Sequence, residues 1–133
     1  MLVITSKSPY AVRALSELAR RGDSAPVPIG DLARSREIPV QFLEGLFATL
    51  RRAGVLQSQR GVKGGYSFAR PPSEVTLLEI VELLEGELGA EAAASGPIWT
   101  DAADAVRAVL AGTTIADVAE REARDSATPM YYI

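Results

Sequence analysis

Two helices joined by a tight turn and followed at once by a β-hairpin are the pattern that most constrains this fold. Residues 29–35 are typical of a short helix, and residues 36–39 form a turn before a longer helix that ends ahead of Gly54. Two strand-like runs, residues 55–59 and 66–69, then flank a glycine-rich loop, which indicates a hairpin. Helix, turn, helix and hairpin together predict a winged helix-turn-helix domain.

Further helices are predicted on both sides of this unit, at residues 8–22, 76–85, 97–112 and from residue 115 onward. Thr76 and Glu79 form a capping box at the start of the second of these helices. Residues 87–96, rich in alanine, glycine and glutamate, fit either a loop or a weak helical extension. The predicted fold class is therefore mainly α (α+β), with a winged helix-turn-helix domain and a C-terminal helical dimerisation arm.

Charge divides the chain into two unequal halves. Residues 1–72 carry 11 Lys and Arg against 5 Asp and Glu, a net charge of +6, and residues 73–133 carry 3 against 12, a net charge of −9. A basic module is typical of proteins that bind polyanions, although chance clustering gives the same pattern. We expect residues 1–72 to form the DNA-binding domain and residues 73–133 to form a helical dimerisation and effector region with a C-terminal tail.

Composition excludes much ordinary catalytic chemistry. The chain has no cysteine and no histidine, so thiolate metal sites and the commonest acid–base group are absent. No nucleophile–base pair or metal cluster is visible either, which predicts no catalytic residues and no metal site. No apolar run approaches the roughly 20 residues that span a bilayer, and the N-terminus lacks a signal-peptide pattern, so we expect a cytoplasmic protein.

The loop "RGVKGGY", residues 60–66, has the residues needed to approach phosphate. Arg60 and Lys63 bring positive charge, and the glycines let the backbone come close to a ligand. A nucleotide-binding loop would need lysine directly after its last glycine and a helix behind it, and here a strand-like run follows. The loop is therefore interpreted as the tip of a wing on DNA, with an ordinary basic hairpin turn as the alternative.

The longer helix of the pair has two different faces. One face is apolar and is expected to pack inward: Phe42, Leu43, Leu46, Phe47 and Leu50. The other is small and polar, with Gln41, Glu44, Gly45 and Ala48 at helical spacing. Gln41 and Glu44 can hydrogen-bond base edges in a major groove, although a solvated face has the same composition.

Three segments resemble the Rrf2 family of bacterial winged-helix regulators in order and spacing: "TSKSPYAVRAL", "FLEGLFATLRRAGVLQSQRGVKGGYSFARPP" and "TLLEIVELLEG". The resemblance covers nearly the whole chain and implies a homodimeric transcription regulator, most simply a repressor, whose partner is an operator in double-stranded DNA. It implies base contacts near Gln41 and Glu44, wing contacts around Arg60, and phosphate contacts near Ser6 and Lys7. The full set of expected DNA-binding residues is Ser6, Lys7, Val40, Gln41, Glu44, Arg51, Gln59, Arg60, Lys63, Gly64 and Tyr66.

The stretch "GAEAAASGP", residues 89–97, departs from the family pattern. Many members hold an iron–sulfur cluster there through cysteines, and this chain has none, so no cofactor is expected. Among the cysteine-free members of the family, the chain resembles the cysteine-metabolism repressors (the CymR-like members). That similarity includes Trp99, several short sequence motifs that follow it, and the aromatic–aromatic–isoleucine sequence at residues 131–133. It suggests control of cysteine or sulfur metabolism.

Two further surfaces are predicted in the acidic half. Large apolar residues beyond a small winged domain are typical of an obligate dimer interface, with an intramolecular core as the alternative. The expected dimerisation residues are Leu83, Leu84, Trp99, Val106, Val109 and Leu110. The tail, Tyr131, Tyr132 and Ile133, either packs on the dimer core or binds a partner. Its terminal isoleucine carboxylate resembles the peptide end that O-acetylserine thiol-lyase accepts in its active site. A small-molecule effector is the other partner considered.

Overall fold

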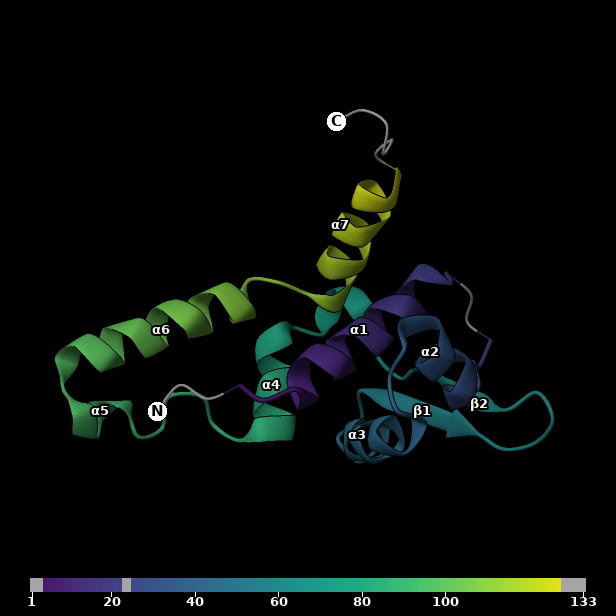
Figure 1. Ribbon diagram of the computed structural model, residues 1–133, viewed down its shortest axis with the longest axis horizontal. Coiled ribbons are helices and arrows are strands. Elements are labelled where there is room, and N and C mark those ends of the chain that lie inside the picture. The colour runs from purple at the N-terminus through teal and green to yellow at the C-terminus, as the bar shows by residue number, and fades with distance from the viewer. Residues whose placement is uncertain (1–3, 23–24, 128–133) are drawn as a thin grey trace.

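Seven α-helices and a two-stranded hairpin make up the part of the chain that the computed structural model describes, residues 4–22 and 25–127 (Figure 1). In chain order the elements are α1 (Lys7–Arg20), α2 (Ile29–Arg36), α3 (Val40–Arg52), β1 (Leu56–Gln59), β2 (Gly65–Phe68), the short 3-10 helix η1 (Pro72–Glu74), α4 (Leu77–Glu85), α5 (Ala92–Ser95), α6 (Pro97–Ala111) and α7 (Ile115–Ala127). The predicted fold class, mainly helical with a winged helix-turn-helix, is confirmed.

Side-chain caps fix the start of two helices in the acidic half. The hydroxyl oxygen of Thr76 accepts a hydrogen bond from the Glu79 amide at 3.2 Å, which begins α4 as predicted. A reciprocal capping box begins α7: the Asp117 amide donates to the Thr114 hydroxyl at 3.1 Å, and the Thr114 amide donates to the Asp117 carboxylate at 2.9 Å. The first turns of these helices are therefore encoded locally.

One hydrophobic core joins the winged unit to part of the acidic half. Helix α1 lies at its centre and packs against α2, α3, α4 and α7. Leu15, Leu32 and Phe47 are fully buried in this core, and so are Ile80 of α4 and Ile115 of α7. The helices α4 and α7 therefore belong to the body that carries the helix-turn-helix.

The hairpin is antiparallel, with Leu56 opposite Phe68 and Gln59 opposite Gly65. Tyr66 also exchanges two backbone hydrogen bonds with Val27, at 2.8 and 2.9 Å, which ties the hairpin to the segment before α2. Gly65 has a φ of +145°, and a Cβ built on it would lie 2.3 Å from the Val27 backbone. Only glycine fits this close crossing.

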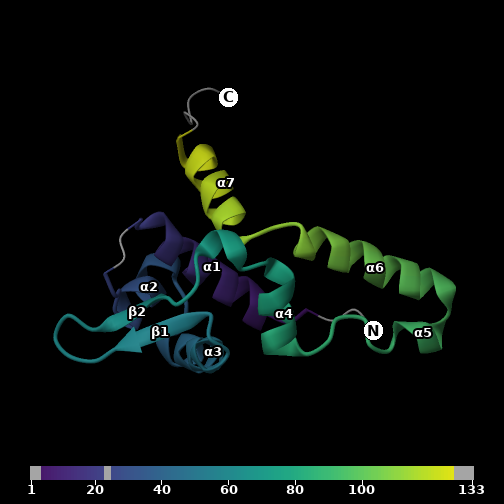
Figure 2. The ribbon, with the colours of Figure 1, turned by 180° about the vertical axis from the view of Figure 1, so that it is seen from behind.

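Helices α5 and α6 extend away from the body as an arm, which both ribbon views show (Figures 1 and 2). The segment left open by the sequence, residues 87–96, contains a single helical turn, α5, before Gly96 at φ +115° leads into α6. Ile98, Trp99 and Val109 on α6 are 69, 54 and 68% exposed. Within the described part of the chain, no helix is long and apolar enough to cross a membrane.

Candidate nucleic-acid interface

A left-handed turn residue sets the angle between α2 and α3. Glu37 has φ 56° and ψ 48°, and it is the one described non-glycine residue at positive φ. The amide of Ile38 then donates to the Ala33 carbonyl at 2.9 Å, and the Ile38 side chain is buried. This turn directs the chain into α3, the second helix of the helix-turn-helix.

Helix α3 buries one face and exposes the other, as its sequence predicts. Leu43, Leu46, Phe47 and Leu50 are buried, and Phe42 is half-buried with its ring edge-on to Tyr10. The exposed face carries Val40, Gln41, Glu44 and Gly45, with Arg51 and Arg52 at the last turn, while Ala48 is half-buried. The exposed face therefore offers an amide, a carboxylate and a methyl-bearing side chain, which are groups that distinguish base edges in a major groove.

No heavy atom outside the helix backbone lies within 4 Å of a Cβ built on Gly45. A bare backbone at the middle of the exposed face lets another surface approach α3 more closely than any larger residue would allow.

The wing presents charged side chains at its tip and buries one of its glycines, Gly64. Arg60 and Lys63 are exposed, as is Gln59 at the end of β1, and Val62 between them is fully exposed. Gly64 is buried, and a Cβ there would lie 2.2 Å from the Gln59 carbonyl oxygen. Any side chain at Gly64 would therefore clash with the loop backbone, so this glycine allows the close packing of the wing loop.

Tyr66, another of the predicted DNA-binding residues, is half-buried. Its ring lies edge-on to the ring of Phe47, with the two ring centroids 5.1 Å apart. Its position anchors the wing to the core.

The N-terminus of α1 lies beside the exposed face of α3. Lys7 and Gln41 line the same hollow of about 330 Å³, which is floored by Phe42 and Leu46 and bordered by Leu83 of α4. Ser6 is the N-cap residue of α1, and its side chain makes no capping hydrogen bond. The structure therefore brings the first turn of α1 and the start of α3 together, although Lys7 and Val40 are 33 positions apart in the sequence.

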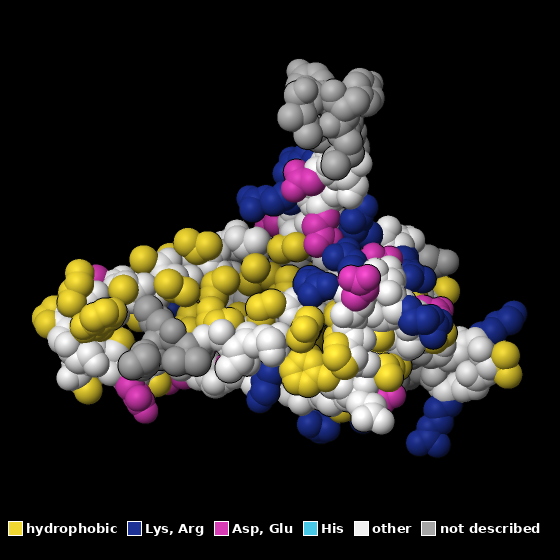
Figure 3. Space-filling model, viewed as in Figure 1, with side chains coloured by type: hydrophobic (Ala, Val, Ile, Leu, Met, Phe, Trp, Pro, Cys, Tyr) yellow, Lys and Arg dark blue, Asp and Glu magenta, His cyan; other side chains and the backbone are white. Residues whose placement is uncertain are grey.

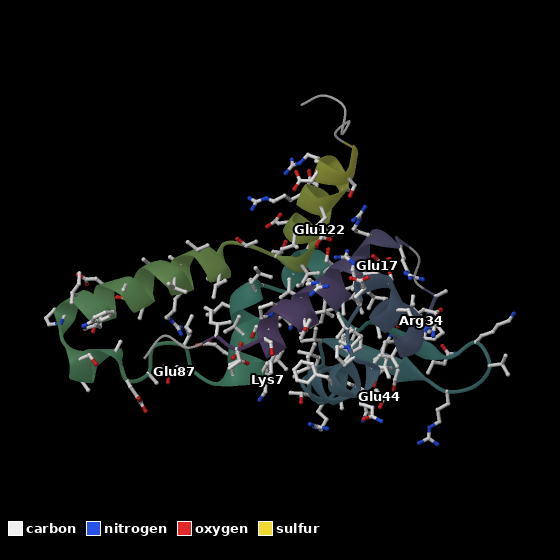
Figure 4. All side chains as sticks on the ribbon, in the orientation of Figure 1. Lys7, Glu17, Arg34, Glu44, Glu87 and Glu122 are labelled. Atoms are coloured by element: carbon white, nitrogen blue, oxygen red, sulfur yellow. The ribbon has the colours of Figure 1, made fainter. Side chains whose placement is uncertain are left out.

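Four cations near the exposed face of α3 and on the wing form no ion pairs within the described residues. Lys7, Arg51, Arg60 and Lys63 form no ion pair with any residue in the ranges that the structure describes, whereas Arg36 does. Lys and Arg side chains lie along the lower edge and at the end of the hairpin in Figure 3, and Figure 4 places both Lys7 and Glu44 on that lower edge. Free cations beside an exposed helix face are the arrangement expected for phosphate contacts.

The model of one protein family matches residues 4–121, and its description is Rrf2, iron-dependent transcriptional regulator. The chain belongs to the Rrf2 family. This Rrf2 chain is therefore a DNA-binding transcriptional regulator, as its sequence predicts, and its relatives and fold are those of regulators rather than enzymes.

Three relatives show the extent of the likeness. CymR of Bacillus subtilis, an HTH-type transcriptional regulator, is 31% identical over 98% of this chain and 99% of its own length. Its solved structure matches with a TM-score of 0.80 over 91% of this chain and 98% of that chain. The structure of IscR from T. potens matches with a TM-score of 0.81 at 31% identity, over 98% of this chain and 97% of that one. An HTH-type regulator of Synechocystis, slr0846, is 42% identical to this chain. The matched region covers 64% of this chain and 58% of the length of slr0846.

The donors of this Rrf2 chain do not fit an iron–sulfur cluster. The whole sequence lacks cysteine and histidine, and residues 89–97 offer one carboxylate, that of Glu91. Such clusters are held by thiolates, with histidine in a minority of types. Within residues 4–22 and 25–127, no three acidic side chains gather in a way that could hold a metal ion.

The predicted dimerisation residues occupy two neighbouring regions. Trp99 and Val109 are exposed on α6, and Val106 and Leu110 on the same helix are half-buried. Leu83 and Leu84 lie on α4, beside the hollow that Lys7 lines. The predicted partner-binding tail, Tyr131, Tyr132 and Ile133, lies outside the described residues.

Sequence reasoning missed two carboxylates that position this interface. Glu85 accepts hydrogen bonds from the Thr5 amide and the Ser8 hydroxyl at the start of α1. Glu122 of α7 binds Arg36 of α2. Their partners lie 77 to 86 residues away in the chain, so no local pattern marks either residue.

Proposed function

We propose that this Rrf2 regulator is a homodimeric repressor that acts by occupying operator DNA, without an iron–sulfur cluster. The observation that carries the proposal is the placement of the exposed face of α3 beside Lys7 of α1, in a unit whose wing tip also presents exposed Arg60 and Lys63. A helix held in this way enters the major groove, and a wing follows the adjacent backbone.

The proposed DNA contacts divide by chemistry. Gln41 suits adenine, because a carboxamide can bond both N6 and N7, and Glu44 suits the amino group of cytosine. Val40, 41% exposed at the first turn of α3, offers methyl groups to thymine. Ser6, Lys7, Arg51, Gln59, Arg60 and Lys63 would bind the sugar–phosphate backbone, with Arg60 at a minor groove, and Gly64 and Tyr66 hold the wing in shape.

The homodimer is supported by the apolar surface of the arm. Hydrophobic side chains spread along α6 and continue toward α4 and α1 in Figure 3. Trp99 and Val109, each more than half exposed, lie on that helix. A large exposed apolar surface marks an interaction site in a soluble protein, and a second copy of the chain is our proposed occupant. A two-fold dimer requires a pseudo-palindromic operator whose half-sites are about one helical turn apart or more.

The proposal that the protein acts without an iron–sulfur cluster is supported by its lack of suitable ligands. The sequence has neither thiolate nor imidazole to hold a cluster, and we propose that a small molecule or a protein partner acting on the dimer tunes operator binding instead.

Cysteine or sulfur metabolism is the regulon we propose. The support is likeness to CymR, which is described as the global cysteine regulator of Bacillus subtilis. Binding of an O-acetylserine thiol-lyase through the Ile133 carboxylate is the matching partner proposal, and the cytoplasm is the matching compartment.

Selection of duplexes from a random-sequence pool with the full chain tests the proposed function. We expect enrichment of a pseudo-palindrome whose affinity falls steeply as salt is raised, because each phosphate contact releases counterions. Enrichment of no sequence would contradict operator binding, and enrichment of a single half-site bound by a monomer would contradict the dimer. Removal of Ile133 should abolish thiol-lyase binding and spare DNA binding, and unchanged enzyme binding would exclude the tail as the contact.

A further inference from the structure

A cluster of charged side chains ties the helix-turn-helix to the last helix. Arg36, the final residue of α2, has a side chain that is 15% exposed. Its guanidinium donates to Glu17 of α1 at 3.0 Å and to both carboxylate oxygens of Glu122 of α7 at 2.7 and 3.1 Å. Figure 4 shows Glu17 and Glu122 close together between α1 and α7.

The same cluster also holds its neighbours. The hydroxyl of Ser16, which is fully buried on α1, donates to Glu122. Arg13 donates to the backbone carbonyl of Arg36, so both the side chain and the backbone of Arg36 are fixed. Arg20 lies 3.9 Å from Glu122. In the described part of the chain, no buried side-chain polar atom is left without a partner.

Arg36 stands directly before the residue that sets the helix angle. Glu37 follows it in the left-handed conformation, and α3 begins at Val40. Only three residues, 37–39, lie between Arg36 and α3, so a shift of Arg36 would also move the start of α3. The residues nearest that start, Val40 and Gln41, are those we place on base edges.

Stability alone is a weak explanation for such a pair. Desolvating charged groups offsets most of their attraction, and apolar replacements of similar volume are often as stable. A hydrogen-bonded charge network does fix one relative arrangement of the elements it joins. Here those elements are α1, α2 and α7.

We propose that Arg36 is a positioning residue for DNA reading, and that α7 braces the recognition helix through the Arg36–Glu122 pair. This inference rests on the proposed function, because it takes α3 to be the helix that reads bases. It also assigns α7 a regulatory role: a partner that lifts α7 from α1 lowers operator affinity without touching a DNA-contacting residue.

The test compares Glu122→Gln with Glu120→Gln on the same helix. Both variants remove one negative charge from α7, but Glu120 forms its ion pair with Arg124 on the surface of the same helix, at 3.6 Å. Binding is measured on the duplex selected by the wild-type chain and on its scrambled version. We expect Glu122→Gln to weaken binding to the selected duplex about fivefold or more. Binding to the scrambled duplex, and both affinities of Glu120→Gln, should stay within about twofold of wild type.

A brace with a purely structural role gives a different result. In that case Glu122→Gln lowers the unfolding temperature, while the ratio of selected to scrambled affinity stays at the wild-type value; this outcome overturns the inference. Arg36→Lys is the second variant, because it keeps the charge beside both carboxylates but loses the two-pronged hydrogen bonds. It should lower the same ratio, and an unchanged ratio in Arg36→Lys also overturns the proposal.

Hydrogen exchange supplies an independent readout. The amides of Glu37 and Ile38 donate to carbonyls of α2, and we expect them to exchange faster in Glu122→Gln than in Glu120→Gln. Equal rates would contradict the brace. If the wild-type chain selects no duplex at all, the proposed function itself fails, and that result is known before any variant is made.

Discussion

The carboxylate of Glu85 accepts a hydrogen bond from the hydroxyl of Ser8, which joins the end of α4 to the first turn of α1. The other carboxylate oxygen of Glu85 accepts a hydrogen bond from the backbone amide of Thr5. These hydrogen bonds lower the pKa of Glu85 even though its partial burial acts in the opposite direction. One carboxylate of the acidic half therefore holds the segment that carries Ser6 and Lys7, two of the proposed phosphate contacts.

Replacement of Glu85 should loosen that segment. Glu85→Ala leaves the buried Ser8 hydroxyl without its acceptor, and such a loss typically costs about 1–3 kcal/mol. We expect a lower midpoint of urea unfolding and weaker binding to the selected duplex. Glu87→Ala removes an exposed carboxylate two positions away and should change neither. Equal midpoints for the two variants would contradict the assigned role of Glu85.

Acid should destabilise the fold by protonating carboxylates whose pKa is lowered in the folded state. The pKa of Glu122 is lowered by its hydrogen bond from Arg36, and the pKa of Glu17 is lowered because its arginine partners outweigh the effect of burial. A folded-state pKa below the ordinary value of 4.5 means that this stabilisation is complete above about that pH and is lost as the pH falls through the lowered values.

Urea midpoints measured from neutral pH into the acid range check this sign. We expect a smaller acid-side decrease for Glu122→Gln than for wild type. A decrease of equal size would show that Glu122 is not among the groups responsible.

The wing should contribute to DNA binding through charge. Arg60→Ala and Lys63→Ala should each weaken duplex binding and reduce the salt slope by about 0.9, the value for one phosphate contact. Arg121→Ala removes the same charge from an exposed position on α7 and should leave the slope unchanged. The measurement is a titration of the selected duplex at several salt concentrations, and an unchanged slope for both wing variants would refute the wing contacts.

Replacement of Gly45 by alanine should stabilise the fold but weaken DNA binding. Alanine is favoured over glycine inside a helix by about 1 kcal/mol, and a Cβ at this position meets no other atom within 4 Å. Gly45→Ala should therefore raise the free energy of unfolding while it weakens DNA binding, because the added methyl group lies on the face that approaches the groove. Stronger or unchanged DNA binding would mean that this face does not contact DNA closely.

The apolar arm should carry the dimer. Val109→Glu places a charge on the exposed face of α6, and we expect sedimentation to show a shift to monomer with the helix content retained. Val62→Glu makes the same change on the fully exposed wing tip and should leave the oligomeric state unchanged. A Val109→Glu protein that sediments as wild type does would contradict the proposed interface.

Local patterns were sufficient to predict most of the elements. The capping residues Thr76 and Thr114 mark two helix starts, and the apolar spacing of α3 identifies its buried face. The two strand-like runs on either side of the glycine-rich loop predict the hairpin. The first strand begins one residue later than predicted, at Leu56, because the Val55 amide donates a hydrogen bond to the Leu50 carbonyl. Such features depend on neighbours within a few residues.

Long-range contacts were beyond the reach of sequence patterns. The bridge between Val27 and Tyr66, and the cluster formed by Arg36 with Glu17 and Glu122, join segments whose separation gives no periodic signal. The sequence does not predict the single turn of α5 either, because an alanine- and glycine-rich segment has no strong preference for one conformation.

The most direct test of the account is the sequence selected by the full chain when Gln41 and Glu44 are changed. We predict that the wild-type chain enriches a pseudo-palindrome, and that Gln41→Ala and Glu44→Ala each relax the preference at one base position per half-site, which typically corresponds to about 1–3 kcal/mol. The same enriched sequence for wild type and both variants would contradict the claim that α3 reads the operator.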